Sequence, residues 1–263
     1  MDAGIGLLAA AAAVRRLRPD ADLVLSSDPD GMPWGPRTPQ DLTTRALTVA
    51  EAAVAHRPDA LIVACNTASV HALPALRARL EPDLPVIGTV PAIKPAAAGG
   101  GPVVVWATPA TTGSPYQRRL IEEFAAGARV VEVPCPGLSD AVECADEAAI
   151  GRTVAAAAER TPGEASAVVL GCTHYELVAE RIRAALRRPG QPPIALHGTA
   201  DAVAAQALRR LGKRPAPEAP AEGTLTVLLS GHEAALPAAA LAYEEGRLLQ
   251  AVGPACREAV PER

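Results

Sequence analysis

The sequence predicts an α/β protein with mainly parallel sheets, and two observations support this prediction. Short β-branched runs alternate along the chain with longer segments rich in Ala, Leu, Arg and Glu, as in proteins built from repeated strand–helix units. The expected strands are apolar along their whole length instead of alternating with polar residues. Such strands are typical of parallel sheets that helices cover on both faces.

The same pattern sets the order of the elements. The expected strands occupy residues 21–27, 60–65, 85–90, 102–108, 128–134, 167–172, 193–198 and 224–230. The expected helices occupy residues 7–18, 39–57, 67–80, 114–126, 139–160, 175–188, 199–212 and 234–248. Two Pro/Gly-rich segments interrupt them, a crossover at 91–102 and a flexible surface loop at 212–223. We therefore expect two similar α/β lobes, the first formed by residues 1–92 plus 206–263 and the second by residues 93–205.

Composition narrows the class of protein. The chain has 263 residues, of which 49% are hydrophobic, enough for two compact cores. A net charge of −4 without a long basic stretch argues against nucleic acid or an acidic membrane surface as a partner. Five cysteines are too few for a disulfide scaffold, and the first apolar run follows Asp2 instead of a basic region, unlike a signal peptide. These features predict a cytoplasmic protein with free thiols and no membrane span.

Two cysteines stand in matching contexts. Cys65 ends the run "LIVAC" and is followed by Asn66 and Thr67, while Cys172 ends "VVLGC" and precedes Thr173 and His174. Catalytic groups of open α/β sheets gather at the carboxyl ends of the strands, and each thiol is expected at a helix N-terminus, which favours a thiolate. One such cysteine would be read as structural, but two indicate function.

Other segments suit a binding site. "DAGIG" (2–6) lacks the third glycine of a dinucleotide fingerprint, so we expect it to let the backbone approach a small ligand, with Asp2 in the site. "DGMPWGPRTP" (30–39) is a rigid loop, and "WATPATTGSPY" (106–116) suits anion binding or helix capping. No metal-binding spacing occurs, and no metal is predicted. The remaining candidates are assigned to packing or to the surface: Cys135, Cys144, Cys256, His56 and His71.

These motifs resemble the glutamate racemase family of the aspartate/glutamate racemase superfamily. The family's DSGVGG, PYG, ACNTAS, TxxT and GCTHYPLL motifs appear here, in the same order, as "DAGIGL", "PWG", "ACNTAS", "TPAT" and "GCTHYEL". The resemblance implies two α/β lobes with the active site in the cleft between them, and Cys65 and Cys172 as the catalytic pair. It also implies the following substrate contacts: Asp2, Ala3, Trp34, Gly35, Asn66, Thr67, Thr108, Thr111, Thr173 and His174.

The chain departs from the family's motifs near its beginning. Ala3 replaces a serine, Trp34 a tyrosine and Leu7 a glycine. Only Met1 precedes Asp2, where the family has a short strand. We therefore expect Asp2 to be poorly held and the activity to be weak.

The implied reaction is the interconversion of L- and D-glutamate, without a cofactor, for peptidoglycan synthesis. One thiolate removes the α-proton and the opposing thiol delivers another, so the two thiols should be reduced and face one cleft. The alternatives are a related racemase acting on aspartate, a hydantoin or a dicarboxylate, a non-catalytic binding protein, and a redox protein with bridging thiols. A homodimer is one option for the assembly.

Overall fold

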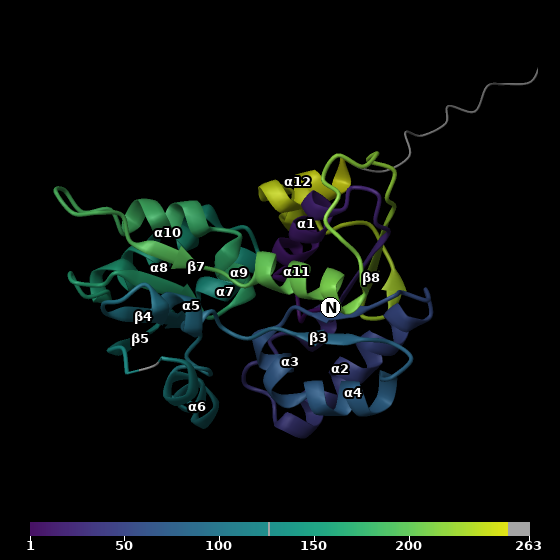
Figure 1. The fold of residues 1–263 in the computed structure, drawn as a ribbon, viewed down its shortest axis with the longest axis horizontal. Coiled ribbons are helices and arrows are strands. Elements are labelled where there is room, and N and C mark those ends of the chain that lie inside the picture. Colours follow the sequence, from purple (N-terminus) through teal and green to yellow (C-terminus); the bar gives the residue numbers. More distant parts are fainter. Residues whose placement is uncertain (126, 252–263) are drawn as a thin grey trace, which may run out of the picture.

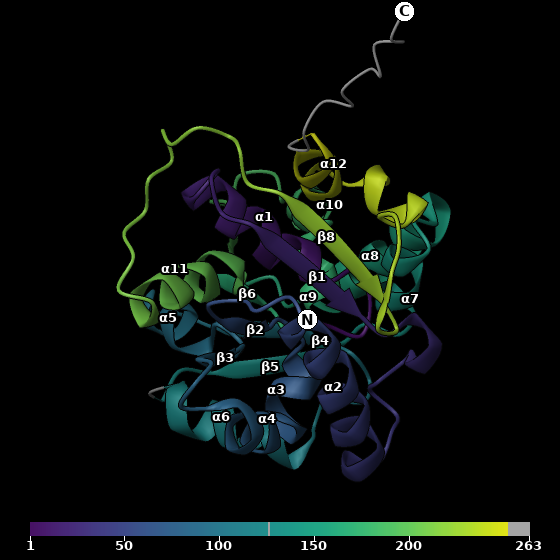
Figure 2. The same ribbon diagram turned by 90° about the vertical axis from the view of Figure 1, so that its right-hand side faces the viewer.

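The computed structural model describes residues 1–125 and 127–251, and it has the predicted α/β architecture in two lobes (Figures 1 and 2). Cys256, assigned above to packing or the surface, and the last part of the predicted first lobe lie outside the described residues. None of the described helices is both long enough and apolar enough to cross a membrane.

The second lobe contains one four-stranded parallel sheet in the order β5-β4-β6-β7. Its strands are β4 (Val103–Ala107), β5 (Val130–Pro134), β6 (Ala167–Leu170) and β7 (Ala195–His197). All residues of β4 and β6 are buried, which explains their uniformly apolar sequences. The helices that follow and flank these strands are α5 (Ile93–Ala98), α6 (Pro115–Phe124), α7 (Leu138–Glu143), α8 (Glu147–Arg160), α9 (Thr173–Glu176) and α10 (Ala179–Ala185).

The first lobe contains two smaller sheets. In one, β1 (Leu23–Ser27) pairs in parallel with β8 (Leu225–Leu229), which also pairs in antiparallel with β9 (His232–Glu233). In the other, β2 (Leu61–Val63) pairs in parallel with β3 (Val86–Gly88). The helices are α1 (Leu7–Leu17), α2 (Pro39–Val54), α3 (Asn66–His71), α4 (Leu73–Leu80), α11 (Ala200–Arg210), α12 (Glu244–Gln250), and the 3-10 helices η1 (Pro29–Gly31) and η2 (Ala238–Ala242).

The first residues of the chain connect these two sheets. The Asp2 N–H donates to Ser26 O (3.1 Å), and the Ala64 N–H donates to Met1 O (2.9 Å). Asp2 and Ser27 form a parallel bridge, and Asp2 is only 1% exposed. The expectation that Asp2 is poorly held is therefore wrong, because backbone hydrogen bonds on both sides fix it. The strands β1 and β2 do not pair with each other directly. A cavity of about 470 Å³ is lined by residues of β1, β2, α1 and α11.

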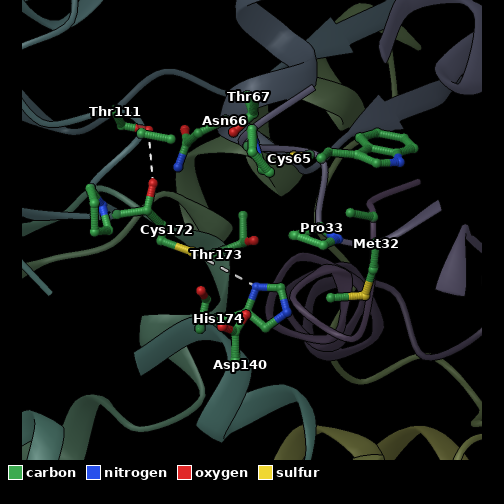
Figure 3. A pocket seen from close by; sticks show the side chains of 18 of the residues that line it. Met32, Pro33, Cys65, Asn66, Thr67, Thr111, Asp140, Cys172, Thr173 and His174 are labelled. Atoms are coloured by element: carbon green, nitrogen blue, oxygen red, sulfur yellow. Dashed lines mark hydrogen bonds between the residues drawn. The ribbon is translucent and has the colours of Figure 1, made fainter. Parts of the chain in front are cut away.

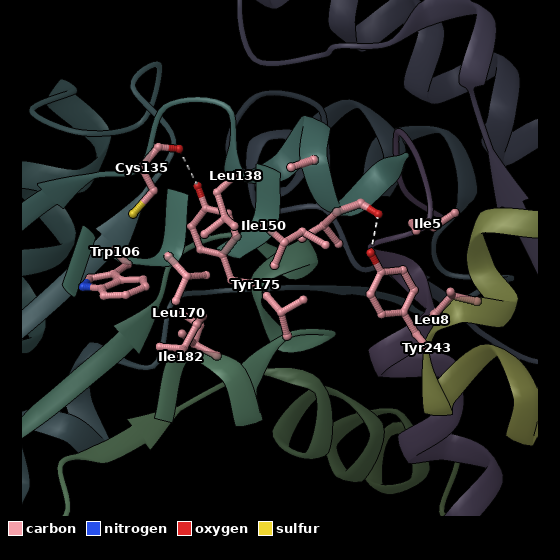
Figure 4. Packing of buried hydrophobic residues seen from close by; sticks show 14 of the residues in the cluster. Ile5, Leu8, Trp106, Cys135, Leu138, Ile150, Leu170, Tyr175, Ile182 and Tyr243 are labelled. Atoms are coloured by element: carbon pink, nitrogen blue, oxygen red, sulfur yellow. Dashed lines mark hydrogen bonds between the residues drawn. The ribbon is translucent and has the colours of Figure 1, made fainter. Parts of the chain in front are cut away.

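The largest apolar core includes residues from both lobes. Ile5 and Leu8 from the beginning of the chain belong to the same cluster as Tyr175 of α9 and Tyr243 next to α12 (Figure 4). Tyr243 donates its hydroxyl to the carbonyl oxygen of Val142 at 2.6 Å, which ties the residues just before α12 to α7. The two lobes are thus joined by apolar packing as well as by the crossovers of the chain.

The predicted element order is largely confirmed. All eight expected strands are present, each trimmed at one or both ends, while the two-residue β9 was missed. The expected helices at 67–80, 139–160 and 175–188 are each divided in two, and 234–248 holds η2 and α12. The segment 91–102, predicted as a turn region, contains α5. The boundaries after residues 92 and 205 stay a prediction, although the second falls inside α11, which packs on α1 and β3.

Candidate active site

One pocket of about 300 Å³ lies between the lobes and collects every residue predicted for the site (Figure 3). The first lobe provides Asp2, Ala3, Trp34, Gly35, Cys65, Asn66 and Thr67. The second lobe provides Thr108, Thr111, Cys172, Thr173 and His174. Five motifs that lie far apart in the sequence therefore meet at one place, where the carboxyl ends of β2, β4 and β6 come together.

The wall from the first lobe begins where β2 ends. Cys65 is buried and directly precedes α3, so the side chains of Asn66 and Thr67 start the helix at the pocket. Asn66 donates Nδ2–H to the carbonyl oxygen of Gly171 across the lobes, at 3.1 Å. Its Oδ1 is buried and has no hydrogen-bond partner within the described chain. Such an acceptor is costly unless a donor reaches it, which makes this wall suited to a ligand with N–H or O–H groups.

The wall from the second lobe begins where β6 ends. Gly171 packs against β4, where a Cβ would lie 2.8 Å from the carbonyl oxygen of Trp106. Cys172 follows, and its Sγ lies 3.8 Å from Nδ1 of His174. The thiols of Cys65 and Cys172 are both free, as the two-base hypothesis predicts and the disulfide alternative does not.

His174 is held by a residue that the sequence analysis missed. Its Nε2 lies 2.8 Å from Oε2 of Glu143, the last residue of α7, and the Ile5 N–H donates to the same oxygen at 2.9 Å. Burial alone would lower the pKa of His174, but the hydrogen bonds to Cys172 and Glu143 and the charges of Cys172 and Asp2 hold it well above 6.5. These contacts therefore favour the protonated form of His174. No local pattern marks Glu143, because its role depends on a histidine 31 residues away.

Asp2 lies at the base of the pocket and links the lobes. Its Oδ2 accepts the hydroxyl of Thr173 at 2.9 Å, and its Oδ1 accepts the N–H of Ala3. Burial raises the pKa of Asp2, although the charge of His174 and these hydrogen bonds partly offset the increase. Gly6 allows this contact, since a Cβ there would lie 2.3 Å from Oγ1 of Thr173. The group that approaches closely at Gly6 is therefore Thr173 of the second lobe, while the approach of a small ligand to "DAGIG" stays a prediction.

The loop with Trp34 forms part of the rim. Trp34 is 2% exposed, and its indole N–H donates to Oδ2 of Asp28 at 2.9 Å, so this donor is already engaged. A Cβ on Gly35 would be 3.4 Å from that of Ala110, which shows that this loop touches the loop after β4. In that loop the hydroxyls of Thr108 and Thr111 lie 3.2 Å apart.

The electrostatics of Cys65 differ from the prediction. Burial raises the pKa of this thiol well above its usual value, and the nearby Asp2 and Cys172 raise it further. A hydrogen bond to the backbone of Ala68 in the six-residue α3 lowers the pKa of Cys65, but by less than burial raises it, so the expected net preference for a thiolate is not found at Cys65.

Several further residues that line the pocket were not predicted, three of them inside the family motifs, four in neighbouring loops and two in α7. They are Met32, Pro33, Pro36, Pro109, Ala110, Pro136, Gly137, Ser139 and Asp140. No lysine or arginine lines the pocket, so His174, whose pKa is raised, is the lining side chain best suited to carry a positive charge. A bound carboxylate would therefore depend on hydroxyl and backbone N–H donors as well as on His174.

Both the sequence and the fold are similar to those of known racemases. Residues 6–207 match the Asp/Glu/hydantoin racemase family. The chain is 39% identical over 218 residues to the glutamate racemase of Granulibacter bethesdensis, covering 79% of this chain and 76% of the relative. It is 36% identical over 219 residues to that of Pseudomonas putida (strain W619), covering 81% of each. The crystal structure of Escherichia coli glutamate racemase with L-glutamate and an activator superposes with a TM-score of 0.76 at 27% identity, covering 96% of this chain and 93% of that one. The chain therefore belongs to the glutamate racemase family, within the Asp/Glu/hydantoin racemases, and is an isomerase.

Proposed function

We propose that this enzyme interconverts L- and D-glutamate by a two-base mechanism in which Cys65 and Cys172 exchange the roles of base and acid. The curated relatives named above are glutamate racemases, and the Escherichia coli enzyme was crystallised with L-glutamate. The observation that carries the proposal is that the two free thiols line the same pocket from opposite lobes. Inverting an α-carbon needs a base on one face and an acid on the other, and this arrangement can supply both.

The polar groups around the thiols suit an amino acid. The unpartnered Oδ1 of Asn66 and the carboxylate of Asp2 can accept hydrogen bonds from an ammonium group. The hydroxyls of Thr67, Thr108 and Thr111 and the protonated ring of His174 can donate to carboxylates. Donors fixed around the α-carboxylate would also stabilise the negative charge that develops when the α-proton leaves.

Substrate binding is expected to lower the raised pKa of Cys65. The buried thiol holds its proton because desolvation and the charge of Asp2 disfavour a thiolate. A substrate ammonium group brings a positive charge into the same pocket, and a nearby positive charge lowers the pKa of a thiol. The thiolate would then form together with the enzyme–substrate complex, where it is needed.

Loss of circular dichroism from L-glutamate tests the activity, and single serine variants test the mechanism. Cys65→Ser and Cys172→Ser should each lower racemisation by at least about 1,000-fold, because a serine hydroxyl is a far weaker acid than a thiol and is hardly ever ionised to act as the base. Cys144→Ser is the control, since this cysteine is exposed and does not line the pocket. Wild-type rates in both site variants would end the two-thiol mechanism. Faster turnover of L-aspartate than of L-glutamate would instead assign the chain to the alternative substrate.

The proposal extends to the role of the product. D-glutamate would serve peptidoglycan synthesis, which places the reaction in the cytoplasm. The homodimer stays a prediction that light scattering of the purified enzyme would test.

A further inference from the structure

Glu176, the last residue of α9, reaches the beginning of α11. Its Oε1 accepts hydrogen bonds from the N–H (2.8 Å) and the hydroxyl (2.7 Å) of Thr199, and its Oε2 accepts the N–H of Ala200 at 3.1 Å. Thr199 is the N-cap residue of α11, but its own side chain does not cap the helix. The carboxylate of Glu176 therefore acts as the cap, with its negative charge at the positive end of an 11-residue helix.

The surroundings are built around this carboxylate. A Cβ on Gly198 would lie 2.5 Å from Oε2 of Glu176, so a side chain there would displace the carboxylate from its present position. Thr199 is 3% exposed, which shields the hydrogen bonds from water. Burial raises the pKa of Glu176, while the hydrogen bonds from Thr199 and Ala200 lower it. The carboxylate of Glu176 thus accepts three hydrogen bonds in a largely buried position, so the contact should contribute more than an ion pair exposed on the surface.

Each residue of α9 is tied to a different part of the molecule. Thr173 donates to Asp2 at 2.9 Å, His174 contacts Glu143 at 2.8 Å, and Tyr175 donates to the carbonyl oxygen of Cys135. A helix of four residues has too few hydrogen bonds of its own to keep its orientation. These contacts, and that of Glu176, must therefore decide where α9 presents its side chains.

The contact of Glu176 leads back to the other wall of the pocket. α11 packs on α1 and on β3, and β3 pairs with β2, which ends just before Cys65. Figure 1 shows α9 and α11 next to each other at the junction of the lobes. Cys172, immediately before α9, is thereby connected to Cys65 through Glu176, α11, β3 and β2. Glu176 itself does not line the pocket, so any effect on the reaction must pass through α9.

We infer that Glu176 is a positioning residue. It anchors α9 to α11 and so keeps Cys172 in its position opposite Cys65. The inference rests on the proposed two-thiol reaction. Without the anchor, Cys172 and His174 shift, while Cys65 stays fixed by β2 and α3. Removing the anchor should therefore slow the proton transfers that use Cys172 and leave those that use Cys65 nearly unchanged.

Elimination from the two enantiomers of β-chloroglutamate separates the two sides. A thiolate takes the α-proton, the C–H electrons form the Cα–Cβ double bond, and chloride leaves with the C–Cl electrons. Water then converts the enamine to 2-oxoglutarate and ammonium. Only one base is needed, so Cys172→Ser should stop the reaction of one enantiomer and Cys65→Ser that of the other.

We expect Glu176→Ala to slow the Cys172-dependent enantiomer about 100-fold and the other by less than about threefold, the effect of a displacement near 1 Å. Glu176→Gln should slow the same enantiomer less, because its amide oxygen still accepts from Thr199 while its NH₂ group faces the N–H of Ala200. Glu180→Gln is the control, because Glu180 is exposed on the neighbouring α10. It should match the wild-type enzyme for both enantiomers.

Equal slowing of both enantiomers, or none, in variants that circular dichroism shows to be folded would overturn the positioning role. If Glu176→Ala does not fold, the ratio of the two rates in Glu176→Gln decides. If Cys65→Ser and Cys172→Ser show no preference between enantiomers, the proposed reaction itself fails and this inference falls with it. A one-sided loss in the cysteine variants but not in the Glu176 variants would overturn the inference alone.

Discussion

Replacing Glu143 by glutamine would test how the second lobe holds the charge of His174. The substitution keeps the shape of the side chain and removes one negative charge 2.8 Å from Nε2 of His174. A charge-assisted hydrogen bond is worth about 1.5–3 kcal/mol, against about 0.5–1.5 kcal/mol for a neutral one. We therefore expect the free energy of unfolding to fall by roughly 1–2 kcal/mol where His174 is protonated. The amide oxygen can still accept the N–H of Ile5.

The pH dependence distinguishes this cause from a packing defect. The pKa of His174 is higher in the folded protein than its ordinary value of 6.5. A histidine of this kind adds stability that is fully present below its unfolded pKa and is lost as the pH rises through the folded pKa. The difference between wild type and Glu143→Gln should thus be largest below pH 6.5 and shrink at alkaline pH.

Urea unfolding over a series of pH values, with an NMR titration of the histidine, measures both effects. Glu159→Gln on α8 is the control, because this glutamate is exposed. The same pH dependence in wild type and Glu143→Gln, or an unchanged pKa of His174, would refute the assignment of this pair.

Two further substitutions test the packing around the first lobe. Gly6→Ala places a Cβ 2.3 Å from Oγ1 of Thr173 and should lower kcat/KM about 100-fold. Gly151→Ala, where a Cβ meets nothing within 4 Å, should instead stabilise α8 by about 0.5–1 kcal/mol, and equal effects of the two changes would contradict the steric argument. Arg15→Met removes hydrogen bonds from a buried guanidinium to three carbonyl oxygens. It should lower Tm by roughly 6–12 °C, for a loss of about 3 kcal/mol, while the exposed Arg16→Met should shift Tm by less than about 2 °C. Matching melting curves for the two arginine variants would show that these hydrogen bonds do not stabilise the fold.

The features that were predictable from sequence are those that local residue order determines. Strands buried on both faces must be apolar throughout, so β4 and β6 could be read directly. Cys65 and Cys172 could be assigned to a site because each follows the carboxyl end of a parallel strand, where catalytic groups gather; the two strands belong to different sheets, whose carboxyl ends meet at the same pocket. The break between α7 and α8 was missed because no Gly or Pro marks it, whereas the break between α3 and α4 does carry a signal, Pro74 in the first turn of α4.

The features that were missed depend on contacts between distant segments. Glu143 and Glu176 resemble ordinary surface glutamates in the sequence, and only the fold brings them to His174 and to α11. The ordering of Asp2 was not predicted for the same reason. The backbone hydrogen bond that fixes it is accepted by Ser26, which α1 separates from Asp2 in the sequence. Trp34 is predicted to contact the substrate, but its indole N–H donates to Asp28, a partner that the motif does not reveal.

The core that both lobes share also limits how the enzyme can exchange substrate for product. Ile5, Leu8, Tyr175 and Tyr243 are almost completely shielded from water in one cluster that crosses the junction. A hinge motion that parted the lobes would expose this surface at a cost of about 25 cal/mol for each Å² of apolar area. Opening the rim should cost less free energy than parting the lobes, because there the loops meet through small residues such as Gly35 and Ala110. Entry and release should therefore depend on local displacements of these loops, with the two halves moving as one rigid frame during each turnover.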